Sequence, residues 1–148
     1  SLVKVVAEKI ENSGDVVLDA KAVGSGLHGL QNMKSDSFEV RLLIKALIPK
    51  IENSWDVFDS RSIGTALLGL KLMKSEHEEV RELIRVLCDK VENRCVSVDD
   101  PKVQLPLSGT CLASCLAGIQ SMSSDHAEVR RFIAVISERL QTCEDDFK

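Results

Sequence analysis

The chain repeats itself, and this periodicity restricts its fold more than any other feature of the sequence. The stretch 59–93 is similar to 19–53, and 108–142 is similar to both. All three units share a glycine, a methionine and a Val-Arg pair, at Gly29, Gly69 and Gly118, at Met33, Met73 and Met122, and at Val40-Arg41, Val80-Arg81 and Val129-Arg130. Such self-similarity is typical of a stacked helical-repeat array, in which each unit buries its apolar face against its neighbours.

Each unit is predicted to be a pair of helices, here called helix A and helix B. In helix B the apolar residues fall on one helical stripe. That stripe comprises Val40, Leu43, Ile44, Leu47, Ile48 and Ile51, then Val80, Leu83, Ile84, Leu87, Cys88 and Val91, then Val129, Phe132, Ile133, Ile136 and Leu140. Ser75 with Glu78, and Asp36 with Glu39, have the spacing of a capping box, so helix B is expected to begin there.

Helix A is predicted to begin after Asp19, Asp59 and Ser108, which are all good N-cap residues. Its inner face is expected to continue through the three methionines at Met33, Met73 and Met122. The recurring glycines would then lie inside helix A, where glycine costs about 1 kcal/mol relative to alanine. Their recurrence indicates a close approach of neighbouring helix backbones.

These patterns predict an all-α protein, a right-handed α-solenoid that forms one domain over residues 1–148. It would consist of about three stacked helical-hairpin repeats, at 18–53, 58–93 and 107–142. Residues 1–12 resemble the second half of helix B and are predicted to be an N-terminal half-repeat. Residues 94–107 contain two prolines, Pro101 and Pro106, and are predicted to be an irregular surface loop.

Composition argues against several classes of function. Aromatic residues make up only 3% of the chain, which disfavours base-stacking modules and aromatic-lined peptide grooves. Lys and Arg total 19 against 23 Asp and Glu, so the concentrated basic excess of a phosphate-binding surface is missing. No apolar run has the length of a membrane span, and no membrane insertion is expected.

The five cysteines favour an intracellular compartment that keeps thiols reduced, because their number is odd and the chain is long for a disulfide framework. Cys111 and Cys115 align with small residues of the other units, which indicates core packing rather than a metal site. A disulfide between Cys95 and Cys143 is left open.

Catalysis has little support in the sequence. The three histidines are His28, His77 and His126, and no Ser, Cys or carboxylate recurs beside them in a nucleophile–base arrangement. We therefore expect no catalytic residues, no cofactor and no metal.

The recurring arginines Arg41, Arg81 and Arg130 form a ladder with two interpretations. They could bind a row of phosphates or carboxylates of a ligand. The favoured interpretation is structural, in which each arginine pairs with acidic residues such as Glu78 or Asp125, or with a neighbouring repeat.

A partner is expected where the repeats differ, on the side of helix A opposite its leucine stripe. The candidates on that face are Lys21, Ser25, His28 and Asn32, then Arg61, Thr65, Leu68 and Leu72, then Thr110, Ser114, Ala117 and Ser121. Val103 and Leu105 of the loop are further candidates, because loops often carry the partner contacts of repeat proteins. The alternative is that part of this face packs against the next helix A.

The segment Ile63-Gly64-Thr65-Ala66-Leu67-Leu68-Gly69-Leu70-Lys71-Leu72-Met73, followed by a charged helix B, resembles the octatricopeptide and heptatricopeptide repeats of organelles. Helix A of those repeats carries an Ala-Leu-x-x-Leu core. The resemblance covers nearly the whole chain. It implies an α-solenoid in a plastid or mitochondrion, of a kind that often binds RNA.

Together, these features predict a non-catalytic helical-repeat binding module, or a structural scaffold subunit of a larger assembly, whose partner is a protein. The alternative is a fragment of an organellar RNA-binding helical-repeat protein.

Overall fold

The computed structural model describes residues 2–14 and 16–141, except for the side chains of residues 140 and 141. Over this range the chain is all-helical, as predicted. Its helices are α1 (Leu2–Glu11), α2 (Ala20–His28), α3 (Phe38–Glu52), α4 (Ser60–Leu68), α5 (Glu78–Arg94), α6 (Gly109–Gly118) and α7 (Ala127–Gln141). Within the described residues, the β-structure is limited to one isolated antiparallel bridge between Val96 and Gln104.

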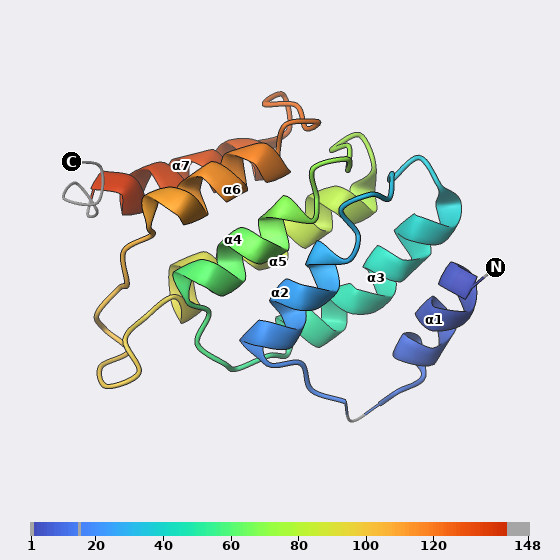
Figure 1. Cartoon of the computed structure of the whole chain (residues 1–148), viewed down its shortest axis with the longest axis horizontal. Coiled ribbons are helices and arrows are strands. Elements are labelled where there is room, and N and C mark those ends of the chain that lie inside the picture. Colours follow the sequence, from blue (N-terminus) through green and yellow to red (C-terminus); the bar gives the residue numbers. More distant parts are fainter. Residues whose placement is uncertain (1, 15, 142–148) are drawn as a thin grey trace.

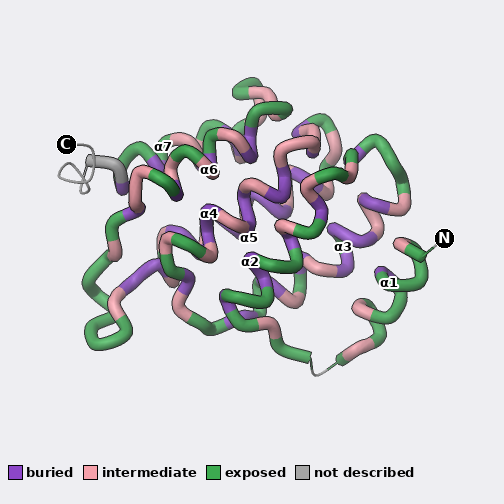
Figure 2. Tube along the Cα trace, viewed as in Figure 1, coloured by how far each residue is buried: buried purple, intermediate pink, exposed green. Residues whose placement is uncertain are grey.

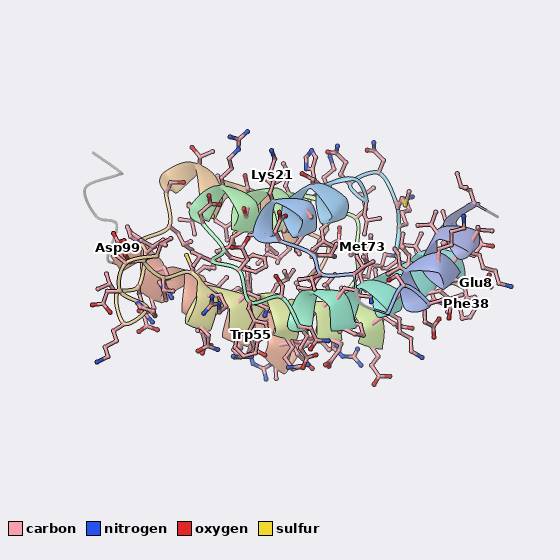
Figure 3. The ribbon with its side chains drawn as sticks, turned by 90° about the horizontal axis from the view of Figure 1, so that it is seen from below. Glu8, Lys21, Phe38, Trp55, Met73 and Asp99 are labelled. Carbon is pink, nitrogen blue, oxygen red and sulfur yellow. The ribbon has the colours of Figure 1, made fainter. Side chains whose placement is uncertain are left out.

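The helices lie in two layers (Figures 1 and 3). Helices α2, α4 and α6 lie side by side in one layer, here called the A layer. Helices α1, α3, α5 and α7 lie side by side in the other, the B layer. The closest backbone contacts therefore join a helix to its counterpart in the next unit, whereas the two helices of one hairpin meet mainly through side chains.

The core lies between the two layers, and buried residues alternate with half-buried and exposed ones along the helices (Figure 2). The A layer and the turns that follow its helices contribute Leu27, Leu67, Leu70 and Met73, which are almost completely buried. The B layer contributes Ile44, Ile51, Leu83, Ile84 and Phe132, also almost completely buried. Each such side chain contributes about 1.5–3 kcal/mol of hydrophobic stabilisation.

The A helices begin where the sequence predicts. The side chains of Asp19, Asp59 and Ser108 each accept a hydrogen bond from the backbone N–H three residues later. These bonds satisfy N–H groups that have no partner within the first turn of the helix.

The A helices end earlier than predicted. α2 stops at His28 and α4 at Leu68, and the three methionines lie in the turns that follow. These turns are closed by short-range bonds, such as Leu30 N–H to Leu27 O at 3.0 Å and Met33 N–H to Leu30 O at 2.9 Å. The apolar spacing continues past the helix because the turn residues point into the same core.

The recurring glycines accordingly lie at helix ends rather than inside helix A, but the predicted close approach is confirmed for two of them. A Cβ on Gly69 would lie 1.9 Å from the carbonyl oxygen of Leu27, and one on Gly118 would lie 1.9 Å from that of Leu67. A β-carbon cannot occupy either position unless the backbones move apart. Glycine therefore sets the spacing of the A layer.

The capping boxes predicted for helix B are wrong. α3 and α5 begin after Ser37 and His77, and neither of these side chains makes a capping hydrogen bond. The Asp36 carboxylate instead accepts a hydrogen bond from Lys74 Nζ of the next unit at 3.2 Å, and Ser75 and its equivalent Ser35 also bond to the next unit. The Ser35 hydroxyl accepts from Lys74 N–H, and the Ser75 hydroxyl accepts from Ser123 N–H, both at 2.8 Å.

Besides the arginine ladder, three cations near the ends of the B helices join successive units. They occupy equivalent positions, and the sequence did not predict their role. Lys50 Nζ donates to Gly14 O at 3.0 Å. Lys90 Nζ donates to Glu52 O at 3.0 Å and to Ser54 O at 2.6 Å. Arg139 donates to Val91 O at 2.6 Å and to Leu105 O at 2.7 Å. Lys90 and Arg139 thus cap the C-terminal ends of α3 and α5, whereas Lys50 bonds to the segment that follows α1.

The segment between α5 and α6 is non-helical, although α5 extends to Arg94, so the loop starts at Cys95 rather than at residue 94. Ser97 N–H bonds to Val103 O at 2.8 Å, and Leu105 N–H bonds to Cys95 O at 2.9 Å. The loop is therefore a small hairpin, held against α7 by the Arg139 guanidinium.

Candidate binding surface

The candidate face of the A helices remains open to solvent. None of its residues is buried; each is either exposed or half-buried. Lys21 projects from α2 on the side of the A layer that faces away from the B layer (Figure 3). Lateral packing of the A helices therefore covers this face only in part.

Two shallow grooves run along this face, one on each side of α4. The groove between α2 and α4 has a volume of about 350 Å³ and is lined by Lys21, Gly24, Ser25, Asp59, Arg61, Ser62 and Thr65. The groove between α4 and α6 has a volume of about 270 Å³ and is lined by Ser60, Arg61, Gly64, Thr65, Ser108, Thr110, Cys111 and Ser114. Arg61 and Thr65 line both grooves, so they are at the centre of the surface.

Gly24 and Gly64 line the grooves and lie close to the backbone of the next A helix. A Cβ on Gly24 would lie 3.1 Å from Ser62 O, and one on Gly64 would lie 3.2 Å from the Cα of Cys111. The absence of side chains at these positions brings the first turns of neighbouring A helices together. The recurrence of Gly24 and Gly64 at equivalent positions was the sequence signal for these grooves.

Hydroxyl groups hold the ends of α4 and α6 together. The Ser60 hydroxyl accepts a hydrogen bond from Ser108 N–H at 3.0 Å and lies 3.1 Å from the Ser108 hydroxyl. The Ser108 hydroxyl in turn accepts from Cys111 N–H at 3.1 Å. These bonds fix the N-terminal ends of two A helices relative to each other.

Hydroxyl and charged groups line the grooves. Ser25, Thr65 and Ser114 offer hydroxyls, and Lys21 and Arg61 offer positive charge. The Asp59 carboxylate already accepts Ser62 N–H at 2.8 Å as a helix cap. Hydroxyls and cations in this arrangement suit the carbonyls and carboxylates of a partner.

The other candidate residues lie outside the two grooves. His28, Asn32, Leu68 and Leu72 come towards or beyond the C-terminal ends of α2 and α4, where Leu68 and Leu72 are half-buried. His28 Nε2 lies 3.4 Å from Gln31 Nε2. The face therefore changes from hydroxyl-rich at the helix starts to aliphatic further along α4.

The loop candidates are not brought into the grooves. Val103 is exposed, whereas Leu105 packs against the hydrophobic core and its carbonyl accepts from Arg139. The loop lies at the end of the array where α6 begins (Figure 1).

The arginine ladder contacts the backbone rather than the carboxylates expected from the sequence. Arg41 donates to Ser35 O at 2.7 Å and Asp36 O at 3.0 Å. Arg81 and Arg130 make equivalent bonds, Arg81 to Ser75 O and Glu76 O, both at 2.9 Å, and Arg130 to Ser124 O and Asp125 O at 2.9 and 2.8 Å. Each arginine thus holds the turn between the A and B helices of its own unit.

The described cysteines are buried thiols. Burial raises the pKa of Cys88 to about 12 and that of Cys95 to about 11. The Sγ atoms of Cys111 and Cys115 lie 4.0 Å apart, and the hydrogen bond between them, with burial, raises the pKa of Cys115. Cys143, the suggested partner of Cys95, lies outside the described residues, as does Thr142.

Among residues 2–14 and 16–141, no group of three or more His, Cys, Asp or Glu side chains is arranged to hold a metal ion. None of the helices described is both long enough and apolar enough to cross a membrane. No family model matches the chain, and comparison with curated proteins and with solved structures gives no match.

Proposed function

We propose that the chain is a non-catalytic binding module that serves as a scaffold or structural subunit of a larger protein assembly. In this proposal its helical pairs form a right-handed α-solenoid. The observation that carries the proposal is the open outer face of the A layer, where the residues that differ between units line two connected grooves.

The partner would be a protein segment that crosses the first two turns of α2, α4 and α6. Its backbone carbonyls would accept hydrogen bonds from the hydroxyls of Ser25, Thr65 and Ser114. Its carboxylates would pair with Lys21 and Arg61, and its apolar side chains would pack on Leu68 and Leu72. The resemblance to organellar repeats favours a plastid or mitochondrion as the place of this assembly.

Site-specific crosslinking tests this proposal. A photoreactive residue at Thr65, at the centre of the two grooves, should give a discrete protein adduct in an extract of the source cell. The same residue at Lys45, which is exposed on α3 of the B layer, is the control. The Thr65 adduct should disappear with Arg61→Glu. Identical adducts from both positions, or an adduct unaffected by Arg61→Glu, would contradict the proposal.

The aliphatic part of the face has its own test. Leu68→Asp combined with Leu72→Asp should abolish retention of that partner in a pull-down. Phe38→Asp is the matched control, because Phe38 is a large exposed apolar residue at the start of α3 (Figure 3). Circular dichroism should show all variants folded. If the control loses the partner as completely as the double variant, the A face is not the contact surface.

The alternative function is RNA binding, favoured by the positions of Lys21 and Arg61 in one groove, with Lys71 in the turn that follows α4. Affinity for single-stranded RNA would then fall steeply with salt, because phosphate contacts release counterions. Substituting all three with Glu should abolish this binding. RNA binding that survives the substitution would exclude this face as its site.

A further inference from the structure

The chain has a single tryptophan, Trp55, which lies on the surface in the connection between α3 and α4. Trp55 is 81% exposed, and Figure 3 looks onto the edge of the array that carries it. It belongs to the middle unit, where α4 has α2 on one side and α6 on the other, so its exposure does not depend on either end of the array. Tryptophan is among the residues that contribute most to binding at protein interfaces. Trp55 therefore offers a partner a large aromatic surface.

The backbone that carries Trp55 is held in place by α5. Ser54 is buried, and its carbonyl accepts a hydrogen bond from Lys90 Nζ at 2.6 Å. The Arg94 guanidinium donates to the carbonyls of Trp55 and Asp56. Because these bonds fix the segment, a partner that binds there would lose little free energy in ordering it.

A groove with a volume of about 360 Å³ lies beside Trp55, between the α1–α2 and α3–α4 connections. Its apolar wall comprises Val17, Ala22 and Trp55, and all three are exposed. Two of its described lining residues, Asp19 and Asp56, are charged, and both are acidic. The groove shares no described lining residue with the two grooves of the A layer, so it is a separate site.

Backbone bonds hold the two carboxylates at the start of α2. Asp19 Oδ1 accepts Ala22 N–H at 2.7 Å, and Asp56 Oδ2 accepts Ala20 N–H at 2.8 Å. A carboxylate offers about four acceptor sites, so both side chains can accept further hydrogen bonds from a ligand. Arg94, the cation bonded to this connection, is directed at backbone carbonyls. The groove therefore combines an aromatic surface with two fixed negative charges.

We propose that this groove is a docking site for an extended, arginine-bearing segment of a partner protein. The guanidinium would donate to the Asp19 and Asp56 carboxylates, and its plane would stack on the Trp55 indole. Arginine fits better than lysine, because its planar guanidinium stacks on aromatic rings and is more weakly hydrated than an ammonium group. The two carboxylates would repel the phosphates of RNA and of anionic lipids. This docking site does not rest on the function proposed for the open face of the A layer.

The fluorescence of Trp55 reports on the site directly, because the chain has no other tryptophan. The full chain is titrated at low salt with the peptide acetyl-Ala-Leu-Arg-Leu-Arg-Ala-amide. We expect a saturable change in emission, and binding about threefold weaker when lysine replaces arginine in the peptide. No change with the arginine peptide, or the same change when glutamate replaces arginine, would overturn the proposal. Equal affinity of the lysine peptide would overturn the choice of arginine.

The charge of the groove is tested with Asp19→Asn, which keeps the helix cap because asparagine and aspartate are equally good N-cap residues. It should weaken binding of the arginine peptide by about three- to fivefold. Asp59→Asn is the matched control, because Asp59 caps α4 in the same way but lines a groove of the A layer instead. It should leave the affinity unchanged. Equal effects of the two substitutions would show that only the overall charge matters and would overturn the site.

The aromatic surface is tested by the fluorescence anisotropy of a dye-labelled arginine peptide. Trp55→Ala should weaken its binding by at least about tenfold. Phe38→Ala, at another exposed aromatic residue, should have no effect, and circular dichroism should show both variants folded. Equal affinities of the two variants would overturn the proposal. A blue shift of Trp55 emission with phosphatidylserine vesicles but not with the peptide would assign the site to a membrane surface and would also overturn it.

Discussion

At the scale of single residues, glycine controls how closely the A helices approach one another. The backbones at Gly69 and Gly118 touch the preceding helix so closely that no β-carbon fits at either position. The carbonyl groups that a β-carbon would meet belong to helices that are themselves packed on the core, so they cannot move aside cheaply. The side-chain hydrogen of glycine is thus a structural requirement at these two positions.

Gly69→Ala should therefore destabilise the protein by about 3 kcal/mol, the cost of overpacking a close contact. Gly26→Ala is the control, because a Cβ there has no heavy atom within 4 Å among the described residues. Since Gly26 lies inside α2, alanine should stabilise by about 0.5–1 kcal/mol. Urea unfolding followed by circular dichroism measures both. Similar effects of the two substitutions would contradict the close approach.

Because several thiols are buried, the stability of the protein should depend on pH in the alkaline range. The pKa values of Cys88 and Cys95 are raised to about 12 and about 11, mainly by burial, whereas an unfolded cysteine ionises near pH ~8.5. Between about pH 8.5 and 11 the unfolded chain has lost protons that the folded chain retains. Stability should therefore fall as pH rises through this window, by about 1.4 kcal/mol per pH unit for each thiol.

The variant Cys88→Ala should show a shallower fall over that window, because it removes one of the protons that the folded chain retains and the unfolded chain loses. Free energies of unfolding at several pH values, measured under reducing conditions, check this slope. An unchanged slope in Cys88→Ala would show that Cys88 ionises in the folded chain as it does in the unfolded one.

At the scale of helices, the C-terminal ends of α3 and α5 each bond to a cation from the next unit. Lys90 lies almost completely buried, with its ammonium group bonded to two carbonyls at the end of α3. Burial lowers the pKa of Lys90, which is the cost of placing a charge there. The carbonyls at the helix terminus have no partner within their own helix, so they offset this cost.

Lys90→Met keeps the aliphatic stem but leaves these carbonyls without their donor, and it should destabilise the protein by about 2 kcal/mol. Lys45→Met, on the exposed side of α3, should change stability by less than about 0.5 kcal/mol. Thermal and urea unfolding of both variants make the comparison. A Lys90→Met variant as stable as its control would show that water can replace the ammonium group.

The sequence was sufficient to predict where the A helices begin but not where they end, and it misplaced the starts of α3 and α5. Asp19, Asp59 and Ser108 act through local hydrogen bonds, so short-range patterns identify them. The length of the A helices was overestimated, because Leu30 and Met33 keep the spacing of a helix although they lie in a turn. The roles of Ser35 and Lys90 depend on bonds to a neighbouring unit, and no local pattern in the sequence reveals such bonds.

At the scale of the whole molecule, part of the candidate surface was identifiable because it lies where the units differ. Lys21, Ser25, Arg61 and Thr65 were chosen as variable positions and do line a common groove. The contributions of Ser60 and Ser108 were missed, since they depend on how two separate helix ends meet. Leu105 was chosen because of its place in a loop, but it is anchored to the core.

The layered arrangement also determines how far a destabilising substitution affects the rest of the chain. Helices of the A layer touch their counterparts in adjacent units, so a change at one interface should weaken its neighbours before the far end. Gly118→Ala, at the α4–α6 interface, should therefore accelerate amide hydrogen exchange in α6 and α7 more than in α1 and α2. Exchange measured by mass spectrometry resolves these segments, and uniform acceleration along the chain would contradict this neighbour-by-neighbour coupling.

The central claim is that successive A helices meet backbone to backbone at their glycines. Proton NMR tests this most directly, because the Hα of Gly69 that takes the place of a Cβ points at His28, whose Cα lies 2.7 Å from that Cβ position. We expect a strong nuclear Overhauser cross-peak between the α-protons of Gly69 and His28, and a second between those of Gly118 and Leu67. The absence of both cross-peaks in a well-resolved spectrum of the folded chain would contradict the stacking of the A layer.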